Sequence, residues 1–254
     1  MIVNHKYKFI FLKSGKTGGS SMEIALSKFT SDNDIVTRIV EEEEEALRNN
    51  LGKNNKNAGD LKVHSTAADL LKFLEAPQYR DKDIFNSYFK FTIIREPIDL
   101  WLSHYFYIHN RKRLKRRRKS NHLHYGSNNI NKWIDNIKHK RLGDWKHISE
   151  GNWNIYSLNN KLIVDDYITY SKDSGPGSKM YEDCTRISEK LNFPENLADI
   201  FYNTRVKTEY RKKDKVTLTK DSLDFIEEVS RREREITGMK LARKEYEKLV
   251  LPLL

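Results

Sequence analysis

A glycine-rich stretch near the N-terminus constrains the fold more than any other feature of this sequence. Residues 6–13 (KYKFIFLK) form a short apolar run rich in aromatic residues, which predicts a buried strand. The loop SGKTGGSS at 14–21 follows directly, and residues 22–29 then show apolar residues at helical spacing. Ser20 and Glu23 fit the S-x-x-E pattern of a capping box, which predicts that the helix starts at Ser20. The sequence therefore predicts a strand, a glycine loop and a helix in direct succession.

Later segments repeat this alternation of strands and helices. Residues 88–94 (YFKFTII) have the near-continuous apolar character of a central parallel strand, and Pro97 suits the first turn of a helix that we expect through residue 108. Residues 161–170 predict a third strand. Further helices are predicted at 66–75, 182–191 and 221–248. The alternation predicts an α/β fold, a P-loop-like three-layer arrangement with a central parallel sheet flanked by helices.

The length and the charge distribution predict how the chain is divided into a domain and its surface segments. Its 254 residues predict a single domain over 1–254. Five glutamates and an Asn-rich continuation predict a mobile loop at 41–60, in which the glutamates start a solvated helix. A basic insertion is expected at 109–147, and its run RKRLKRRRK at 111–119 leaves three interpretations open: a solvated loop, a surface for an acidic glycan, or a surface for nucleic acid or anionic membrane. The net charge of +11 predicts an anionic partner.

Several kinds of site and location are disfavoured by what the sequence lacks. Cys184 stands alone, which excludes an intramolecular disulfide and a multi-cysteine zinc site. The histidines show neither H-x-x-x-H nor H-E-x-x-H spacing, so no metal is expected. The longest apolar run is far shorter than the roughly 18 residues of a membrane helix, and the N-terminus lacks the pattern of a secretory signal. We therefore expect a cytoplasmic protein without a membrane span.

Two segments have the chemistry of phosphate or sulfate binding. A glycine turn between a strand and a helix presents backbone N–H groups and the positive end of the helix dipole to an anion. Lys16 adds a charge there, and three hydroxyl side chains follow it in the loop. The loop is not a Walker A motif, because that motif needs a glycine where this chain has Ile10. The second segment is Arg95, at the end of the strand 88–94, with Ser103 eight residues further on.

Together these motifs resemble the PAPS-dependent sulfotransferases, most closely the carbohydrate branch that includes the heparan sulfate 2-O enzymes and bacterial relatives. The resemblance implies that the loop binds the 5′-phosphosulfate of PAPS and that Arg95 and Ser103 hold its 3′-phosphate. The implied loop residues are Lys16, Thr17, Gly18, Gly19, Ser20 and Ser21. The sequence departs from the family at Leu100, where an arginine is common, and at 170–173, where Tyr-Glu-Asn-Leu is common.

The same resemblance implies a reaction. PAPS would donate a sulfuryl group by in-line displacement to a hydroxyl acceptor, expected to be a carbohydrate, leaving PAP and requiring no metal. Lys16 would stabilise charge on the bridging oxygen. His64, in KVHSTAADL, would act as the general base, with His104 as the second candidate. Two alternatives stay open: a P-loop kinase, for which Asp165-Asp166 is the tempting metal-binding pair, and a nucleic-acid-binding module that uses the basic run.

Overall fold

The computed structural model describes residues 1–39, 42–51, 53–77, 82–115, 129–139, 148, 151–204 and 216–246. The chain divides into two compact units. Unit 1 comprises residues 1–95 and 152–206, and unit 2 comprises residues 96–151 and 207–254. The expectation of a single domain stays a prediction.

Unit 1 is built on a five-stranded mixed sheet. In spatial order the strands are β3 (Ile35–Val36), β1 (Ile2–Asn4), β2 (Phe9–Leu12), β4 (Phe89–Ile94) and β7 (Asp166–Thr169). The predicted parallel arrangement holds for β2, β4 and β7, whereas β1 pairs antiparallel with both of its neighbours. The carboxyl ends of the three parallel strands therefore meet at one edge of the sheet, where ligands of such sheets bind.

Two of the predicted strands have different boundaries in the structure. The chain forms a hairpin before β2, because the Asn4 side-chain oxygen accepts a hydrogen bond from Tyr7 N (2.7 Å) and Lys8 adopts a positive φ of 53°. The strand predicted at 6–13 is thus the shorter β2. The strand predicted at 161–170 is split into β6 (Lys161–Leu162), which pairs with β5 (Ser157–Leu158), and β7.

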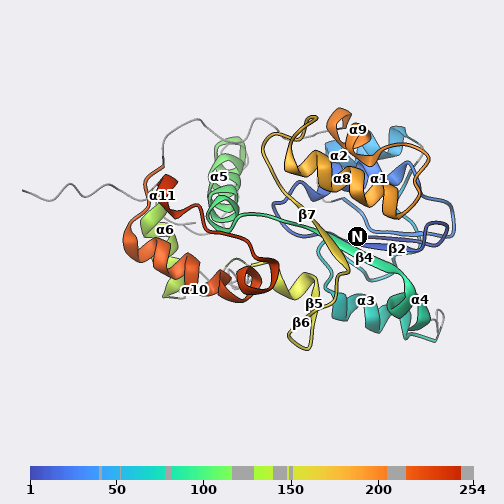
Figure 1. Cartoon of the computed structure of the whole chain (residues 1–254), viewed down its shortest axis with the longest axis horizontal. Coiled ribbons are helices and arrows are strands. Elements are labelled where there is room, and N and C mark those ends of the chain that lie inside the picture. The colour runs from blue at the N-terminus through green and yellow to red at the C-terminus, as the bar shows by residue number, and fades with distance from the viewer. Residues whose placement is uncertain are drawn as a thin grey trace, which may run out of the picture. The chain divides into compact units, whose positions relative to one another are not determined.

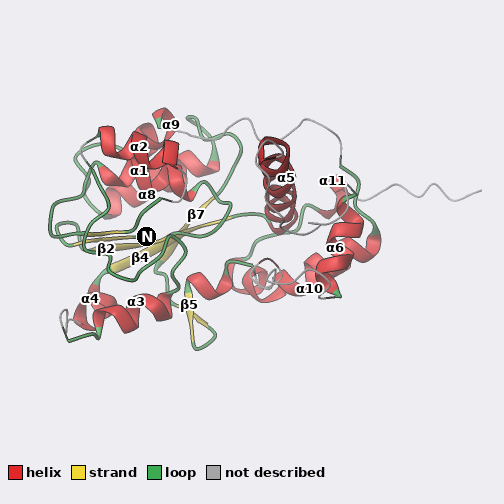
Figure 2. Cartoon of the chain, turned by 180° about the vertical axis from the view of Figure 1, so that it is seen from behind, coloured by secondary structure: helices red, strands yellow, loops and turns green. Residues whose placement is uncertain are grey.

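Helices cover both faces of this sheet, which confirms a layered α/β arrangement (Figures 1 and 2). One face carries α1 (Gly19–Ser27), α2 (Glu42–Asn50), α8 (Lys179–Lys190) and α9 (Leu197–Asn203), and the other carries α3 (Ala67–Leu74) and α4 (Lys82–Ser87). Buried phenylalanines from β2 and β4 pack with apolar residues of α1, α8 and α9 in one core. Burial of these apolar side chains is the main force that holds the layers together.

Side-chain caps explain where several of these helices begin. Thr66 and Asp69 form a reciprocal capping box at α3, so the helix predicted there is confirmed. Ser178 caps α8, and its hydroxyl accepts a hydrogen bond from Tyr181 N (3.2 Å). Asn196 caps α9, a helix that the sequence analysis did not predict.

The glutamate-rich segment 41–60 contains α2, but this helix is not the solvated helix that we expected. Glu45 and Arg48 are buried, and the Arg48 guanidinium donates to the Glu45 carboxylate (2.7 Å) and to Thr37 O (2.9 Å). The Asn-rich continuation then pairs with β3, because Lys56 forms a β-bridge with Val36. Mobility of this segment stays a prediction.

Unit 2 is helical. Its elements are α5 (Pro97–Lys115), α6 (Ile130–Lys138), α10 (Lys220–Thr237) and α11 (Arg243–Tyr246). Trp101 of α5 packs edge-on against Trp133 of α6 and Phe225 of α10, each with ring centroids 5.7 Å apart. The helix predicted at 221–248 ends at residue 237, because Gly238 adopts the left-handed conformation (φ 69°) that terminates helices.

The basic insertion expected at 109–147 falls in unit 2 and is only partly described. Helix α5 continues to Lys115 rather than ending at residue 108, and Asn129 caps α6. Residues 116–128 and 140–147 lie outside the described residues, so the three interpretations of the basic run stay open. Across the described part of the chain, no helix has both the length and the apolar character needed to cross a membrane.

Candidate active site

The glycine loop joins β2 to α1 and leaves the N-terminus of α1 open. The helix begins at Gly19, and its N-cap Gly18 has a φ of 83° and makes no side-chain capping bond. The first turn of α1 contains no acidic residue. Because the first N–H groups of any helix lack intrahelical acceptors, this end offers donors and a positive dipole to an anion. The capping box predicted from Ser20 and Glu23 is therefore wrong.

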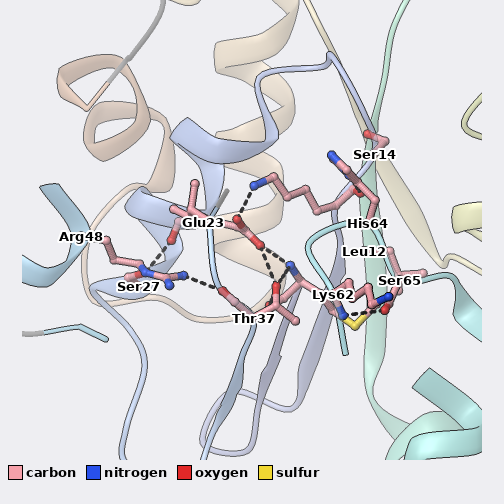
Figure 3. Close-up of polar contacts among 12 residues, drawn as sticks. Leu12, Ser14, Glu23, Ser27, Thr37, Arg48, Lys62, His64 and Ser65 are labelled. Atoms are coloured by element: carbon pink, nitrogen blue, oxygen red, sulfur yellow. Dashed lines mark hydrogen bonds and ion pairs between the residues drawn. The ribbon is translucent and has the colours of Figure 1, made fainter. Parts of the chain in front are cut away.

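Glu23 is instead the centre of a buried ionic cluster under the loop (Figure 3). Its carboxylate lies 2.6 Å from Lys13 Nζ and also contacts the ammonium group of Met1. Burial disfavours the charged carboxylate, but the two neighbouring cations outweigh it, so the pKa of Glu23 is lowered. This ion pair fixes the Lys13 side chain against Gly19. A Cβ added at Gly19 would lie only 2.8 Å from Lys13 Cγ, so this position of the loop needs glycine.

The loop is also stabilised by hydrogen bonds between its hydroxyl groups. The Ser14 hydroxyl donates to Ile93 O of β4. Its oxygen lies 2.7 Å from Thr17 Oγ1, and since Ser14 has already used its proton, the Thr17 hydroxyl donates in that bond. Thr17 is fully buried. Its hydroxyl therefore serves the loop itself.

Arg95 lies beside the loop, at the carboxyl end of β4. One guanidinium nitrogen donates to Lys16 O, and Lys16 has a positive φ of 60°. The guanidinium carbon stands 4.1 Å from the centroid of the Tyr170 ring, which follows β7. Tyr170 also borders the loop, since a Cβ at Gly18 would lie 3.5 Å from its ring. The structure thus brings Lys16 and Arg95 together, as expected, and adds Tyr170, which the sequence analysis did not assign to the site.

His64 also lies beside the loop, in the turn before α3. Reciprocal hydrogen bonds between Lys62 and Ser65 hold that turn: Lys62 N donates to Ser65 Oγ (2.8 Å), and Ser65 N donates to Lys62 O (3.0 Å). His64 Nδ1 lies 3.2 Å from Lys13 O. A carbonyl oxygen only accepts, so Nδ1 carries the proton and Nε2 keeps its lone pair. A Cβ at Gly15 would lie 4.0 Å from His64 Cε1, which places the ring next to the loop.

The surroundings of His64 favour its neutral form. Surrounding protein atoms desolvate the ring and lower the pKa of His64 from 6.5 to about 4, although the hydrogen bond to Lys13 O opposes this effect. The His64 side chain is nevertheless exposed to solvent. Contact with water makes the lowering of its pKa smaller than it would be for a fully buried ring. At neutral pH the imidazole is therefore uncharged and able to accept a proton at Nε2.

The remaining candidate residues lie outside the glycine loop, on α5 and at the start of β7. Ser103 and His104 are half-buried on α5 in unit 2, and the expectation that Ser103 holds the 3′-phosphate together with Arg95 stays a prediction. Asp165 accepts a hydrogen bond from Lys90 N (2.6 Å), and Asp166 forms an ion pair with Arg186. Both carboxylates of the pair considered for a kinase metal site therefore bind other residues of unit 1. In the described ranges, no three His, Cys, Asp or Glu side chains gather in a way that could hold a metal ion.

Comparison with known proteins assigns the family. The model of the sulfotransferase family matches residues 1–237. The chain belongs to the sulfotransferase family. No curated protein and no solved structure gives a significant match. Membership confirms that the chain resembles sulfotransferases and assigns it to the transferases that move a sulfuryl group.

Proposed function

We propose that this sulfotransferase moves a sulfuryl group from PAPS to a hydroxyl group of a carbohydrate. The observation that carries the proposal is the open N-terminus of α1, which has no side-chain cap and no acidic residue in its first turn. In the loop that leads to this end, Arg95 donates to the carbonyl oxygen of Lys16, and His64 adjoins the loop at Gly15. Backbone donors and cations at the loop, with a neutral imidazole beside it, fit an anionic donor and a hydroxyl acceptor.

The loop residues hold the donor and respond to the charge that develops in the reaction. PAPS supplies a sulfuryl group whose bond to the bridging phosphate oxygen breaks as the acceptor oxygen bonds to sulfur. The N–H groups at the start of α1 bind the anionic end of the donor. Lys16 places a positive charge where the leaving oxygen becomes negative, and such preorganised charges are among the largest contributions to catalysis.

His64 handles the acceptor proton. Its Nε2 lone pair accepts the proton of the attacking hydroxyl, while the bond from Nδ1 to Lys13 O holds the ring in that tautomer. The low pKa makes His64 a weaker base than an ordinary histidine, but it keeps the base unprotonated over a wide pH range. The carbohydrate nature of the acceptor is supported by the family resemblance and by the net charge of +11, which favours acidic glycans.

Replacing Arg95 tests the assignment of the 3′-phosphate. We expect Arg95→Ala to weaken binding of PAP by about 100-fold, because a charged hydrogen bond to phosphate contributes roughly 1.5–3 kcal/mol. Binding of AMP, which lacks the 3′-phosphate, should weaken much less, through the lost contact with Lys16 O alone. Calorimetric titration of both nucleotides measures the difference. Equal losses for PAP and AMP would contradict the 3′-phosphate role and leave Arg95 as a residue that only supports the loop.

The acceptor class is tested with radiolabelled PAPS and a panel of acceptors. The panel contains acidic polysaccharides, neutral polysaccharides and small phenols, and both label transfer and PAP release are measured. We expect label in a polysaccharide, with acidic polysaccharides preferred. Label in phenols alone would contradict the carbohydrate assignment. Turnover of ATP with Mg²⁺ in place of PAPS would contradict the proposed donor.

A further inference from the structure

Asn152 contacts the glycine loop from a segment far along the chain. Its side-chain oxygen accepts a hydrogen bond from Gly15 N (2.7 Å), and its side-chain nitrogen donates to Gly15 O (3.0 Å). One carboxamide therefore satisfies both backbone polar groups of a single loop residue, as a neighbouring strand would. Only an amide side chain offers a donor and an acceptor in this arrangement, whereas a carboxylate can only accept.

The segment that carries Asn152 is buried and hydrogen-bonded within unit 1. Asn152 is only 6% exposed and begins the short 3₁₀ helix η1 (Trp153–Ile155), and Ile155 N donates to Asn152 O (2.9 Å). Tyr156, which follows, is fully buried. The next strand, β5, contacts α3, the helix that follows the His64 turn. Asn152 thus belongs to a rigid part of the protein that also supports the candidate base.

Gly15 lies at the point where the loop, Asn152 and His64 meet. A Cβ at Gly15 would lie 3.3 Å from Asn152 Oδ1 and 4.0 Å from His64 Cε1. The next residue is Lys16, whose carbonyl oxygen is held by Arg95. Two consecutive loop residues are therefore held by side chains that come from elsewhere in unit 1. These contacts restrict the backbone just before the N–H groups that face the anion.

From this geometry we infer that Asn152 is a positioning residue for donor binding: its amide holds Gly15 so that the loop is preorganised for the anionic end of PAPS. The inference rests on the proposed function, because the ligand of the loop is the donor named there. Preorganisation improves affinity by removing the ordering cost that a flexible loop would otherwise bear when it binds. Asn152 itself need not touch the donor.

The test compares two replacements of Asn152 with a matched control. Asn152→Ala removes both contacts. Asn152→Asp keeps the shape and the contact to Gly15 N, but it sets a carboxylate against Gly15 O and adds a negative charge beside the anion site. The control is Asn203→Ala, which removes an exposed amide at the end of α9 in the same unit. PAP affinity is measured by calorimetry, melting temperature by circular dichroism, and hydrogen exchange of residues 13–21 by mass spectrometry without nucleotide.

We expect Asn152→Ala to weaken PAP binding about tenfold, the loss expected for one or two hydrogen bonds. Asn152→Asp should weaken PAP binding further, and both variants should show faster hydrogen exchange in the loop. Asn203→Ala should match the wild type in both measurements. Wild-type PAP affinity in both folded Asn152 variants, or a lower melting temperature with unchanged affinity and loop exchange, would overturn the inference. If the wild type itself fails to bind PAP, the proposed donor is contradicted, and unchanged loop exchange in the nucleotide-free variants would then overturn the role of Asn152 separately.

Discussion

Replacing Lys16 by alanine is expected to lower kcat by about 10²–10³-fold, the cost typical of removing one preorganised group that stabilises developing negative charge. The loss should appear mainly in kcat, because Lys16 acts most strongly on charge that develops as the bond to the leaving oxygen breaks. Lys16 is half-buried in a loop whose path is held by Arg95 and Asn152, so the fold should survive the substitution. Transfer of labelled sulfuryl groups under saturating PAPS measures kcat directly.

Lys28→Ala is a suitable control for this experiment, because Lys28 follows the other end of α1 and pairs only loosely with Glu195 (3.5 Å). It removes the same charge at the opposite end of α1, away from the loop. Lys16→Arg should retain part of the activity, since it keeps the charge with a different shape. Near-normal kcat in Lys16→Ala, with the melting temperatures of all variants alike, would contradict the role in charge stabilisation.

Replacing His64 by alanine is expected to lower kcat by about 10²–10⁴-fold, the usual contribution of a general base. PAP affinity should stay within a few fold of the wild type, because His64 adjoins the loop through Gly15 and Lys13 O rather than through the open end of α1. His139→Ala is the control, since His139 is an exposed residue at the end of α6 that pairs with Asp135. A large loss of PAP affinity with a small loss of kcat would make His64 a ligand contact and contradict its role as a base.

The pH profile gives a second test of His64. A base is active when unprotonated, and the pKa of His64 is lowered from its usual 6.5, so the decline of kcat on acidification should be centred below pH 6.5. The unfolded chain binds this proton near pH 6.5, so His64 also makes the fold less stable as pH drops from 6.5 towards 4. Melting temperatures must therefore be measured at each pH. A decline of kcat centred at 6.5 or above, in protein that is still folded, would contradict the desolvated environment of His64.

The strand, loop and helix at the N-terminus could be predicted because each of their signals is local. The apolar runs predict β2 and β4, and the glycines predict the loop between β2 and α1. The helix predicted at 66–75 is confirmed as α3, and Thr66 and Asp69 form a capping box at its start. The carboxyl ends of parallel strands meet at one edge of a sheet, so the approach of Arg95 to the loop followed from the order of the strands. Tyr170 follows β7 at the same edge and could have been found by this rule.

Other features depend on contacts that no local pattern contains. Ser20 and Glu23 match a capping box letter for letter, yet Glu23 turns inward because Lys13 and the ammonium of Met1 compensate its charge in the core. The Asn152 contact joins residues 137 positions apart in the chain. The hydrogen bond of His64 to Lys13 O spans 51 positions, and the tautomer of the base depends on it. These features arise from tertiary packing, which overrides short sequence patterns.

The measurement that tests the central claim most directly is a thermal-shift titration with PAP, using AMP and ATP with Mg²⁺ as comparators. A ligand at 100 times its dissociation constant stabilises the folded state by about 2.7 kcal/mol, which corresponds to roughly 5–10 °C for units of this size. The proposed function predicts a shift of this order with PAP and much smaller shifts with the two comparators. A shift with ATP and Mg²⁺ alone, or no shift with PAP at millimolar concentration, would contradict it.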